Sequence, residues 1–348
     1  IRRPPRSTLS SSSAASDVYK RQVKNILNFK KDLKPVLNDM EFVMDCLIQK
    51  YARKKNIKKT LNLDFKKKYS YISKLNIHDL DQYFNTRLPR DHVKPESDYF
   101  ATQSLWNLIT NKNILDVVEK ILGKEIMSNP VQNTRIKQPE KKLPKDSVHD
   151  GLSGRTPWHQ DAAVLNSKGQ KLTEMVTVWI PFTKTTKKNG CMITVKEINK
   201  MGLLNHVPGY RGQVELKNSK LLDKMKHVPL EADVGDIILL HKHSIHCSLP
   251  NRSNDFRISA DLRYNVAGQP SGREPLPNFY VRSKNKNNIK IQNFKQWLTL
   301  WEKAKEKCIP RKYAFKYPLP TFKNNKSCLL YTSPSPRDAT LSRMPSSA

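Results

Sequence analysis

The sequence has few cysteines and none of the common nucleotide-binding motifs. It contains five cysteines in 348 residues, and no two of them form a CxxC pair. A disulfide scaffold is therefore excluded, and we expect a reducing compartment, intracellular and most simply cytoplasmic. Neither GxGxxG nor a P-loop pattern occurs, so nothing indicates a dinucleotide or nucleoside triphosphate. The longest apolar runs hold about eight residues, so we predict no transmembrane segment.

The two ends differ in composition from the rest of the chain. Residues 1–22 and 328–348 are rich in Ser, Pro and Arg, whereas the middle is rich in Lys, Asn and Ile. Both ends resemble in-frame translations of sequencing-library adapters, and natural disordered tails are the alternative that their composition also allows. We interpret both ends as adapter-derived and assign residues 23–327 to a single domain, a length that can bury a large core.

Acidic residues are scarce relative to basic ones. There are 63 Lys and Arg against 31 Asp and Glu, which gives a formal net charge of +32. The two ends carry seven basic and two acidic residues, so the remainder has a charge of about +27. The lysine runs are scattered and are not interleaved with aromatic residues, as a single-strand-binding surface would require. An AT-rich coding sequence accounts for Lys, Asn and Ile together, so we predict no nucleic-acid partner.

Hydrophobic spacing predicts helices over residues 23–124. In the first of them, apolar side chains recur at helical spacing at Met40, Val43, Met44, Leu47 and Tyr51. The stretch 104–124 predicts two short amphipathic helices, with Asn113 as the N-cap of the second and Gly123 at its end. A C-terminal helix is predicted at 290–308. Its aromatic face, which includes Trp297 and Trp301, is interpreted as core packing.

Residues 125–285 have the composition of a β-structure. Short runs rich in β-branched and aromatic residues lie between turn sequences, at 175–182, 191–195, 236–241 and 257–266. The strands do not alternate with helices, which favours a sandwich or barrel and argues against a doubly wound α/β fold.

A His-x-Asp pair occurs in the stretch PWHQDAA. If the stretch is a strand end, His159 and Asp161 point to the same side and Gln160 points away. Two histidines and one carboxylate on one face of an octahedron form the facial triad of non-haem iron(II) oxygenases. The pair alone is weak evidence, because His and Asp also lie near each other on ordinary surfaces.

The missing ligand is found among three later histidines, His241, His243 and His246. Only His246 is followed by a serine two residues later, Ser248, and an arginine eleven residues later, Arg257. If the chain returns as an antiparallel strand, Arg257 lies near Ser248 and the two hold a carboxylate in a bidentate fork. We interpret His241 and His243 as strand or turn histidines.

Three nearby residues have simpler interpretations. His206 is expected in a loop, and Cys247 is expected to be a small buried residue and not a nucleophile. Arg273, in the stretch GREP, either contacts the substrate or fixes a loop.

Four stretches resemble the phytanoyl-CoA dioxygenase family: PWHQDAA, TVWIPFTKTTKKNGC, GDIILLHKHSIHCSLPNRSNDFRISADLRYN and GQPSGREPLPNFYVRS. The resemblance covers about residues 100–307. It implies a mainly β, α+β fold with a double-stranded β-helix core (jelly-roll, cupin-like), N-terminal flanking helices and a C-terminal helix. It also implies an enzyme that uses iron(II), 2-oxoglutarate and O2, with ascorbate as an optional reductant.

The resemblance assigns roles residue by residue. It implies that the iron ligands, which form the catalytic centre, are His159, Asp161 and His246. It implies that the residues around 2-oxoglutarate are Arg257, Ser248, Trp179 and Lys137. The NG turn at Asn189 and Gly190 is expected to be structural.

One departure from the family bears on the substrate. Family members often continue after NGC into PGSH, whereas this chain has MITVKEINKMGLL, which helps to shape the mouth of the site. Asp161 occupies the position where related halogenases have a small residue, which favours hydroxylation. The resemblance thus predicts hydroxylation of an unactivated C–H in a small organic or lipid-like substrate, such as an acyl-CoA or a natural product, with release of succinate and CO2. The alternative is a non-catalytic jelly-roll protein that binds a polyanion through a continuous lysine stripe.

Overall fold

A computed structural model describes residues 20–309, apart from 53, 76–79, 89–92, 96, 144–153, 196–201 and 210–212. Of the two ends that we interpret as adapter-derived, only residues 20–22 are described, and they form a strand with Val23 that pairs with residues 237–240, so the sheet begins before the predicted domain boundary. The interpretation of the remainder stays a prediction. Within the described ranges, no helix is long and apolar enough to cross a membrane.

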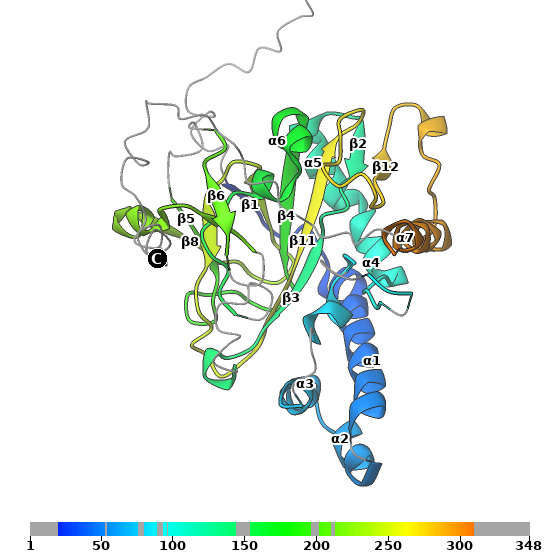
Figure 1. Ribbon diagram of the computed structural model, residues 1–348, viewed down its shortest axis with the longest axis vertical. Coiled ribbons are helices and arrows are strands. Elements are labelled where there is room, and N and C mark those ends of the chain that lie inside the picture. The colour runs from blue at the N-terminus through cyan, green and yellow to red at the C-terminus, as the bar shows by residue number, and fades with distance from the viewer. Residues whose placement is uncertain are drawn as a thin grey trace, which may run out of the picture.

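A seven-stranded antiparallel sheet forms the larger wall of the β core (Figure 1). Its strands lie in the order β1-β9-β4-β11-β2-β12, and β3 pairs with β11 beside β2. They are β1 (Lys20–Val23), β2 (Ile126–Ser128), β3 (Asn133–Lys137), β4 (Met175–Pro181), β9 (Ile237–His241), β11 (Arg257–Val266) and β12 (Phe279–Arg282). The predicted strands at 175–182, 236–241 and 257–266 are therefore confirmed.

The smaller wall is a three-stranded sheet in the order β10-β5-β8. It consists of β5 (Met192–Val195), β8 (His227–Leu230) and β10 (His246–Ser248), and β6 (His206–Pro208) pairs with β7 (Val214–Leu216) as a separate ribbon. An antiparallel bridge between His159 and His246 attaches the His-x-Asp segment to the edge of this sheet. The predicted jelly-roll core with flanking helices is confirmed.

Strand β11 separates the helix-packed core from the polar interior between the sheets. Successive residues of a strand point to opposite faces. One face of β11 is apolar and joins the main hydrophobic core through Ile258, Ala260, Leu262 and Tyr264. The other face is polar and equally buried, and consists of Arg257, Ser259, Asp261 and Arg263.

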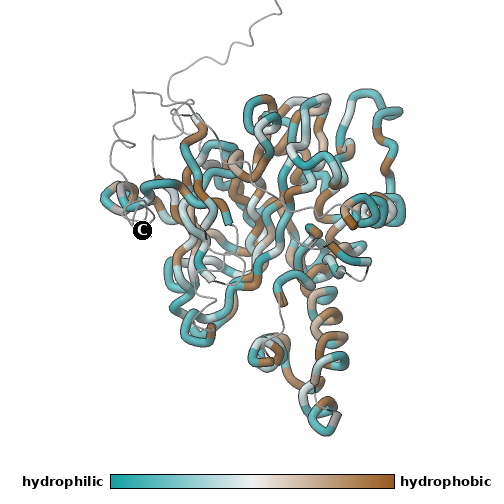
Figure 2. Tube along the Cα trace, in the orientation of Figure 1, coloured by the Kyte–Doolittle hydropathy of each residue, from teal (hydrophilic) through white to brown (hydrophobic). Residues whose placement is uncertain are grey.

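The helices other than 167–172 contribute to the hydrophobic core on the apolar side of the larger sheet, and the helix at 167–172 contacts the turn that begins with Asp161. The helices are α1 (Lys34–Tyr51), α2 (Ile57–Leu61), α3 (Phe65–Ser73), α4 (Gln103–Ile109), α5 (Lys112–Leu122), α6 (Ser167–Leu172) and α7 (Phe294–Cys308). Helices α1 to α3 extend below the body, and α4, α5 and α7 lie beside the larger sheet (Figure 1). Hydrophobic residues follow the strands and recur along α1 (Figure 2). The hydroxyl of Tyr264 donates to Ile109 O at 2.8 Å, which ties β11 to α4.

The start of α5 differs from the prediction, and its end agrees. The N-cap is Asn111 and not Asn113: Asn111 has an extended backbone, and its Oδ1 accepts from the amides of Asn113 and Ile114. Asn113 is already helical, and its side chain donates to Ile26 O at 3.0 Å. Gly123 ends the helix with φ of 81°, a conformation that favours glycine.

The aromatic face of α7 belongs to the core, as predicted. Trp297 is 2% exposed and its ring centroid lies 5.8 Å from that of Trp106 on α4, while Trp301 packs against Tyr99 at 5.7 Å. These contacts hold the C-terminal helix against the N-terminal helical layer.

We expect Trp297→Ala to lower the free energy of unfolding by about 3–5 kcal/mol, because it leaves a cavity in a packed aromatic cluster. Urea unfolding monitored by circular dichroism measures the change. Phe42→Ala on α1 is the control, since Phe42 is 69% exposed and the loss should stay below about 0.5 kcal/mol. Equal losses in the two variants would contradict this account of α7.

Candidate metal centre

Two histidines and one aspartate converge at one end of the polar interior. Candidate ligand atoms of His159, Asp161 and His246 all lie within 4.8 Å of one another, and all three residues are buried. His159 Nε2 is 3.9 Å from Asp161 Oδ1, and the two imidazole centroids are 4.3 Å apart. In the described part of the chain, this is the only such group of His, Cys, Asp or Glu.

The main chain orients both imidazoles. His159 Nδ1 lies 2.8 Å from Pro157 O, and His246 Nδ1 lies 3.0 Å from Ser244 O. Because a carbonyl can only accept, each Nδ1 donates and each Nε2 keeps its lone pair for a metal. Burial and the nearby His246 lower the pKa of His159 well below its usual value, so the ring is neutral at neutral pH, the form that binds a metal.

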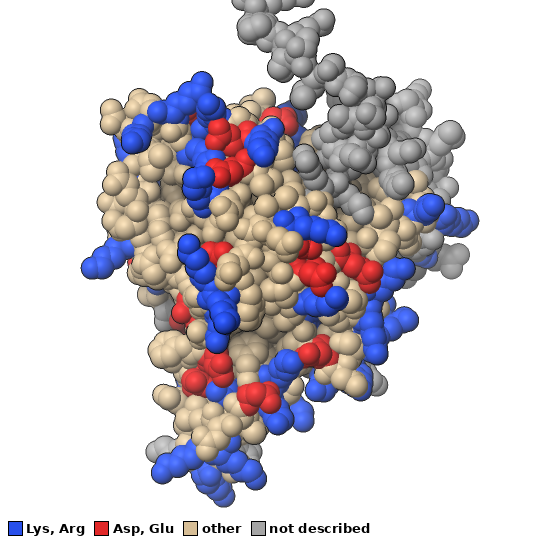
Figure 3. All heavy atoms as spheres, turned by 180° about the vertical axis from the view of Figure 1, so that it is seen from behind, with Lys and Arg blue, Asp and Glu red and all other residues tan. Residues whose placement is uncertain are grey.

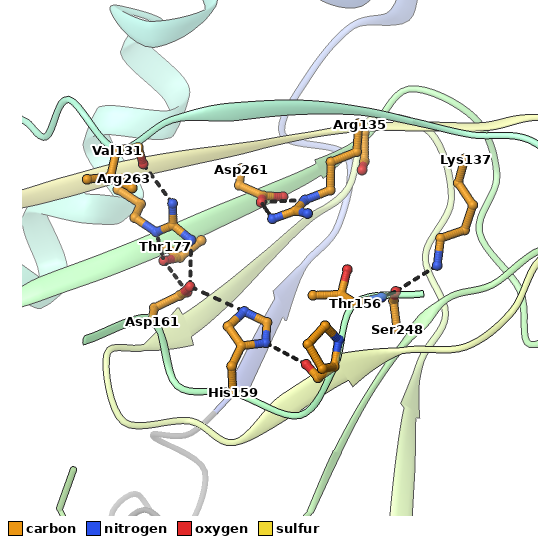
Figure 4. Close-up of polar contacts among 12 residues, drawn as sticks. Val131, Arg135, Lys137, Thr156, His159, Asp161, Thr177, Ser248, Asp261 and Arg263 are labelled. Carbon is orange, nitrogen blue, oxygen red and sulfur yellow. Dashed lines mark hydrogen bonds and ion pairs between the residues drawn. The ribbon is translucent and has the colours of Figure 1, made fainter. Parts of the chain in front are cut away.

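Two residues that sequence reasoning missed hold Asp161. Its Oδ1 accepts from Arg263 Nη2 at 2.5 Å, and its Oδ2 accepts from the Thr177 hydroxyl at 2.6 Å (Figure 4). Burial alone would raise the pKa of Asp161, but Arg263 and the two histidines hold it well below its usual range, so the carboxylate is ionised. A sequence signal existed: Arg263 follows Arg257 by six residues and therefore shares its face of the strand.

Gln160 points away from the centre, as the alternation predicted, and anchors the segment from behind. Its Nε2 donates to Gly202 O and His243 O, both at 2.8 Å, and its Oε1 accepts from Leu204 N at 2.7 Å. The backbone N–H of Gln160 donates to Nε2 of His206 at 3.1 Å. His206 is buried in strand β6, so its assignment to a loop was wrong. Burial lowers the pKa of His206 to about 4, which keeps this nitrogen an acceptor.

Arg257 lies at the far end of the same cavity and bonds only neutral groups. Its Nη1 donates to Ser259 Oγ at 2.7 Å and its Nη2 to Gly190 O at 3.2 Å, while its buried Nε has no partner. The guanidinium carbon is 5.6 Å from the centre of the Trp179 ring. Burial and the nearby Arg135 lower the pKa of Arg257 to about 10, so it remains a cation at neutral pH. A buried cation without a bonded carboxylate favours an anionic ligand.

Ser248 lines this cavity with Arg257, whereas Lys137 lies behind it. Ser248 Oγ accepts from Lys137 Nζ at 2.6 Å and from Thr156 N at 2.9 Å (Figure 4). With both lone pairs used, the hydroxyl proton is left to donate to a ligand. Lys137 also donates to Leu249 O at 2.8 Å, and burial together with Arg257 lowers its pKa well below the usual value. Lys137 thus positions Ser248.

The cavity lies between the two sheets and opens to solvent, and together with its open mouth it spans about 350 Å³ of space free of protein atoms. Its polar lining runs from the His159, Asp161 and His246 group to Arg257 and Ser248. Its apolar lining comes from both sheets and includes Trp179, Met192 and Leu240.

Neighbouring residues have structural roles. The rings of His241 and His243 contact each other at 5.3 Å, and neither belongs to the ligand group, as predicted. Cys247 is buried in a cluster with Trp158, which agrees with its expected role as a small buried residue. Arg273 donates to Val164 O at the end of the turn that begins with Asp161, so it fixes a loop.

The NG turn supports the far end of the cavity. Asn189 Oδ1 accepts from Thr186 N at 2.7 Å, and Gly190 has φ of 85°. A Cβ on Gly190 would lie 2.7 Å from Leu249 O, so only glycine fits at this position, whose own carbonyl accepts from Arg257.

An antiparallel jelly-roll with a buried His-Asp-His group and an unpaired arginine in one cavity is the architecture of the iron(II)- and 2-oxoglutarate-dependent oxygenases. The model of the phytanoyl-CoA dioxygenase (PhyH) family matches residues 77–259, which is more than half of the chain. The chain belongs to the phytanoyl-CoA dioxygenase family, and His159, Asp161 and His246 form its candidate metal-binding triad.

The curated relatives share about a quarter of their residues with this chain over the aligned segments. A probable phytanoyl-CoA dioxygenase of Caenorhabditis elegans is 27% identical over 171 residues, which cover 48% of this chain and 52% of that protein. The 1-deoxypentalenic acid 11-beta-hydroxylase of Streptomyces arenae is 27% identical over 191 residues, covering 51% of this chain and 62% of that protein. The chain thus spans about half the length of the curated relatives it matches.

One solved structure supports the fold. The apo form of the non-heme monooxygenase ThoJ has a TM-score of 0.53 and 18% sequence identity, and the match covers 86% of this chain and 98% of that one. At this level of identity, the likeness concerns the fold alone.

We expect Thr177→Val to weaken iron(II) binding by about 10- to 100-fold, because it removes the donor that orients Asp161 without changing the side-chain volume. Anaerobic competition with a chromophoric chelator measures the affinity. Thr299→Val on the exposed face of α7 is the matched control and should bind iron(II) like the unmodified protein. Unchanged affinity in Thr177→Val would show that Arg263 alone positions the carboxylate.

Proposed function

We propose that the protein is an iron(II)- and 2-oxoglutarate-dependent hydroxylase that acts on an unactivated C–H of a small organic or lipid-like substrate. The observation that carries the proposal is one cavity with a His-Asp-His group at one end and an unpaired buried arginine at the other. Such a pair of sites suits a metal and a chelating dicarboxylate together. A metal alone would not account for the buried arginine, and a dicarboxylate alone would not account for the His-Asp-His group.

The residues present fit the metal. His159, Asp161 and His246 offer two neutral nitrogens and one carboxylate oxygen, the donor set that suits iron(II) and leaves positions open for other ligands. When bound, iron with 2-oxoglutarate and O2 supplies the oxidation: one oxygen atom enters the substrate as hydroxyl and the other enters succinate, with loss of CO2.

The residues at the far end fit 2-oxoglutarate. The partnerless Nε of Arg257 and the free hydroxyl proton of Ser248 provide donors for the far carboxylate. Trp179 limits the width of the cavity beside Arg257. Lys137 contributes by holding Ser248 in place. The chain's own part in the reaction is to bind and orient, and to keep bulk water out of a buried site.

The substrate is proposed from two considerations. Asp161 supplies a carboxylate ligand, so hydroxylation is favoured over halogenation. The names of the two relatives refer to phytanoyl-CoA and to 1-deoxypentalenic acid, so an acyl-CoA or a natural product is the class we propose.

A polyanion-binding protein without catalysis receives no support from the surface. On the face that Figure 3 shows, basic side chains are interspersed with acidic ones, and they gather only at the lower tip. That tip corresponds to the region of α2, where Lys55, Lys58 and Lys59 are exposed. The continuous stripe that this alternative predicts is not visible on this face.

Loading the protein anaerobically with iron(II) and 2-oxoglutarate should produce the weak visible charge-transfer band of the chelate, and adding O2 should produce succinate. His159→Ala should abolish both signals, because a group with one ligand missing loses most of its metal affinity. His241→Ala is the control, since that ring lies outside the group, and it should retain both. A wild-type protein with neither band nor succinate would overturn the proposal.

Arg257→Ala should retain iron(II) but require roughly 100-fold more 2-oxoglutarate, because truncating one partner of a buried charge pair costs about 2–5 kcal/mol. Titrating the visible band with 2-oxoglutarate gives the affinity. Arg252→Ala, at an exposed arginine nearby, serves as the control. An unchanged affinity in Arg257→Ala would place the anion elsewhere.

A further inference from the structure

The cavity contains a second ion pair, Arg135 with Asp261, which neither the metal group nor the Arg257 site uses. Both residues line the cavity. Asp261 lies on the polar face of β11, four residues after Arg257 and two before Arg263, or about 13 Å and about 7 Å along the strand. Figure 4 shows the pair between the Asp161–Arg263 and Ser248–Lys137 contacts. A molecule that fills the cavity between the metal group and its Arg257 end would therefore lie beside the pair.

The geometry of the pair leaves one oxygen free. Arg135 Nε donates to Asp261 Oδ2 at 2.8 Å, and Arg135 Nη2 approaches the same oxygen at 2.7 Å. A fork-to-fork pair would use both carboxylate oxygens. Here Oδ1 is buried without a hydrogen-bond partner, on a side chain that is 6% exposed. An unpartnered buried carboxylate oxygen is costly, so this atom calls for a donor supplied by a ligand.

2-Oxoglutarate does not meet this need. Its two carboxylates and its ketone only accept hydrogen bonds at neutral pH, so they would face Oδ1 with acceptors. An unsubstituted hydrocarbon chain has no donor either. The remaining donors are ordered water and the molecule that is oxidised, and a substrate hydroxyl that displaces the water restores its hydrogen bond.

The charge of the cavity selects a neutral donor. Its charged lining consists of three arginines and two aspartates, Arg135, Arg257, Arg263, Asp161 and Asp261. Their sum is one positive charge, and the charges of iron(II) and the 2-oxoglutarate dianion cancel each other. A cationic group would add a second uncompensated positive charge in a buried site, which is unfavourable.

We propose that Asp261 is a specificity-determining residue that accepts a hydrogen bond from a neutral donor, a hydroxyl group, on the substrate. Arg135 positions it by occupying Oδ2. The substrate is therefore an already oxygenated molecule and not a plain hydrocarbon chain. This inference rests on the proposed function, which supplies the co-substrate and the site of oxidation.

Binding of three probes of similar size tests the inference: cyclohexylmethanol, cyclohexyl methyl ketone and ethylcyclohexane. Each is titrated into anaerobic protein loaded with iron(II) and 2-oxoglutarate, and binding is followed by the shift of the visible band. The alcohol should bind about 10- to 100-fold more tightly than the ketone and the hydrocarbon, as expected for a hydrogen bond to a charged acceptor.

Asp261→Asn tests whether the free position of residue 261 accepts the hydrogen bond, because this variant places a donor there. Its amide oxygen must accept from Arg135, so the NH2 group takes the free position and an acceptor becomes a donor. The preference for the alcohol over the ketone should then vanish, because both probes can accept. The double variant Arg135→Met/Asp261→Leu removes both charges together and should bind all three probes alike. Asp116→Asn, in the remote pair with Arg282, should behave like the wild type.

The outcomes separate this inference from the proposed function. A wild-type band with no preference for the alcohol in any comparison overturns the role of Asp261 and leaves the oxygenase proposal intact. Absence of the band overturns the oxygenase proposal itself. Tighter binding of cyclohexylmethylammonium than of the alcohol would replace the neutral donor with a cation. An alcohol preference that persists in both Asp261 variants would show that the pair is only structural.

Discussion

The structure depends on the burial of a row of charged side chains on one face of strand β11. Charges withdrawn from water are costly unless they are paired, and the charged side chains of this row differ in how completely they are paired. Arg263 donates to Asp161, and Arg257 has only neutral partners. Asp261 is paired with Arg135 through only one of its two carboxylate oxygens. The first pairing orients a metal ligand, while the incomplete pairing of the other two leaves positions that ligands can occupy. The complete pair thus supports the metal group, and the incomplete ones leave polar atoms that face the cavity.

The metal group depends on a second constraint, the short bridge between the His-x-Asp segment and β10. His159 and His246 exchange both backbone hydrogen bonds at 3.0 Å, which sets the distance between their rings. Gln160 and His206 secure the same segment from its other side. Backbone and buried amide contacts that do not involve a metal hold the ligand segment, which is the support that a site of this kind requires.

Much of the fold could be predicted because its signals are local. Runs of β-branched and aromatic residues bounded by turn sequences located β4, β9 and β11, and the glycine at 123 ended α5 where expected. The N-cap of α5 was misplaced by two residues because Asn111 and Asn113 are equally good caps by composition, and only the backbone conformation chooses between them. His206 was assigned to a loop because its strand is only three residues long and pairs with the equally short β7, in a ribbon that lacks a longer run of β-branched and aromatic residues.

By itself, the sequence determined the donor types, their order and their spacing: two histidines, one carboxylate, and a serine and an arginine at fixed intervals after the second histidine. Those follow from strand periodicity and from the chemistry of the side chains. Only the tertiary structure decided which carboxylate oxygen is free, which arginine has no acidic partner, and that Lys137 stands behind Ser248. These depend on the register between strands far apart in the chain, such as Lys137 opposite Arg257. That register is set by packing of the whole core and has no local signature.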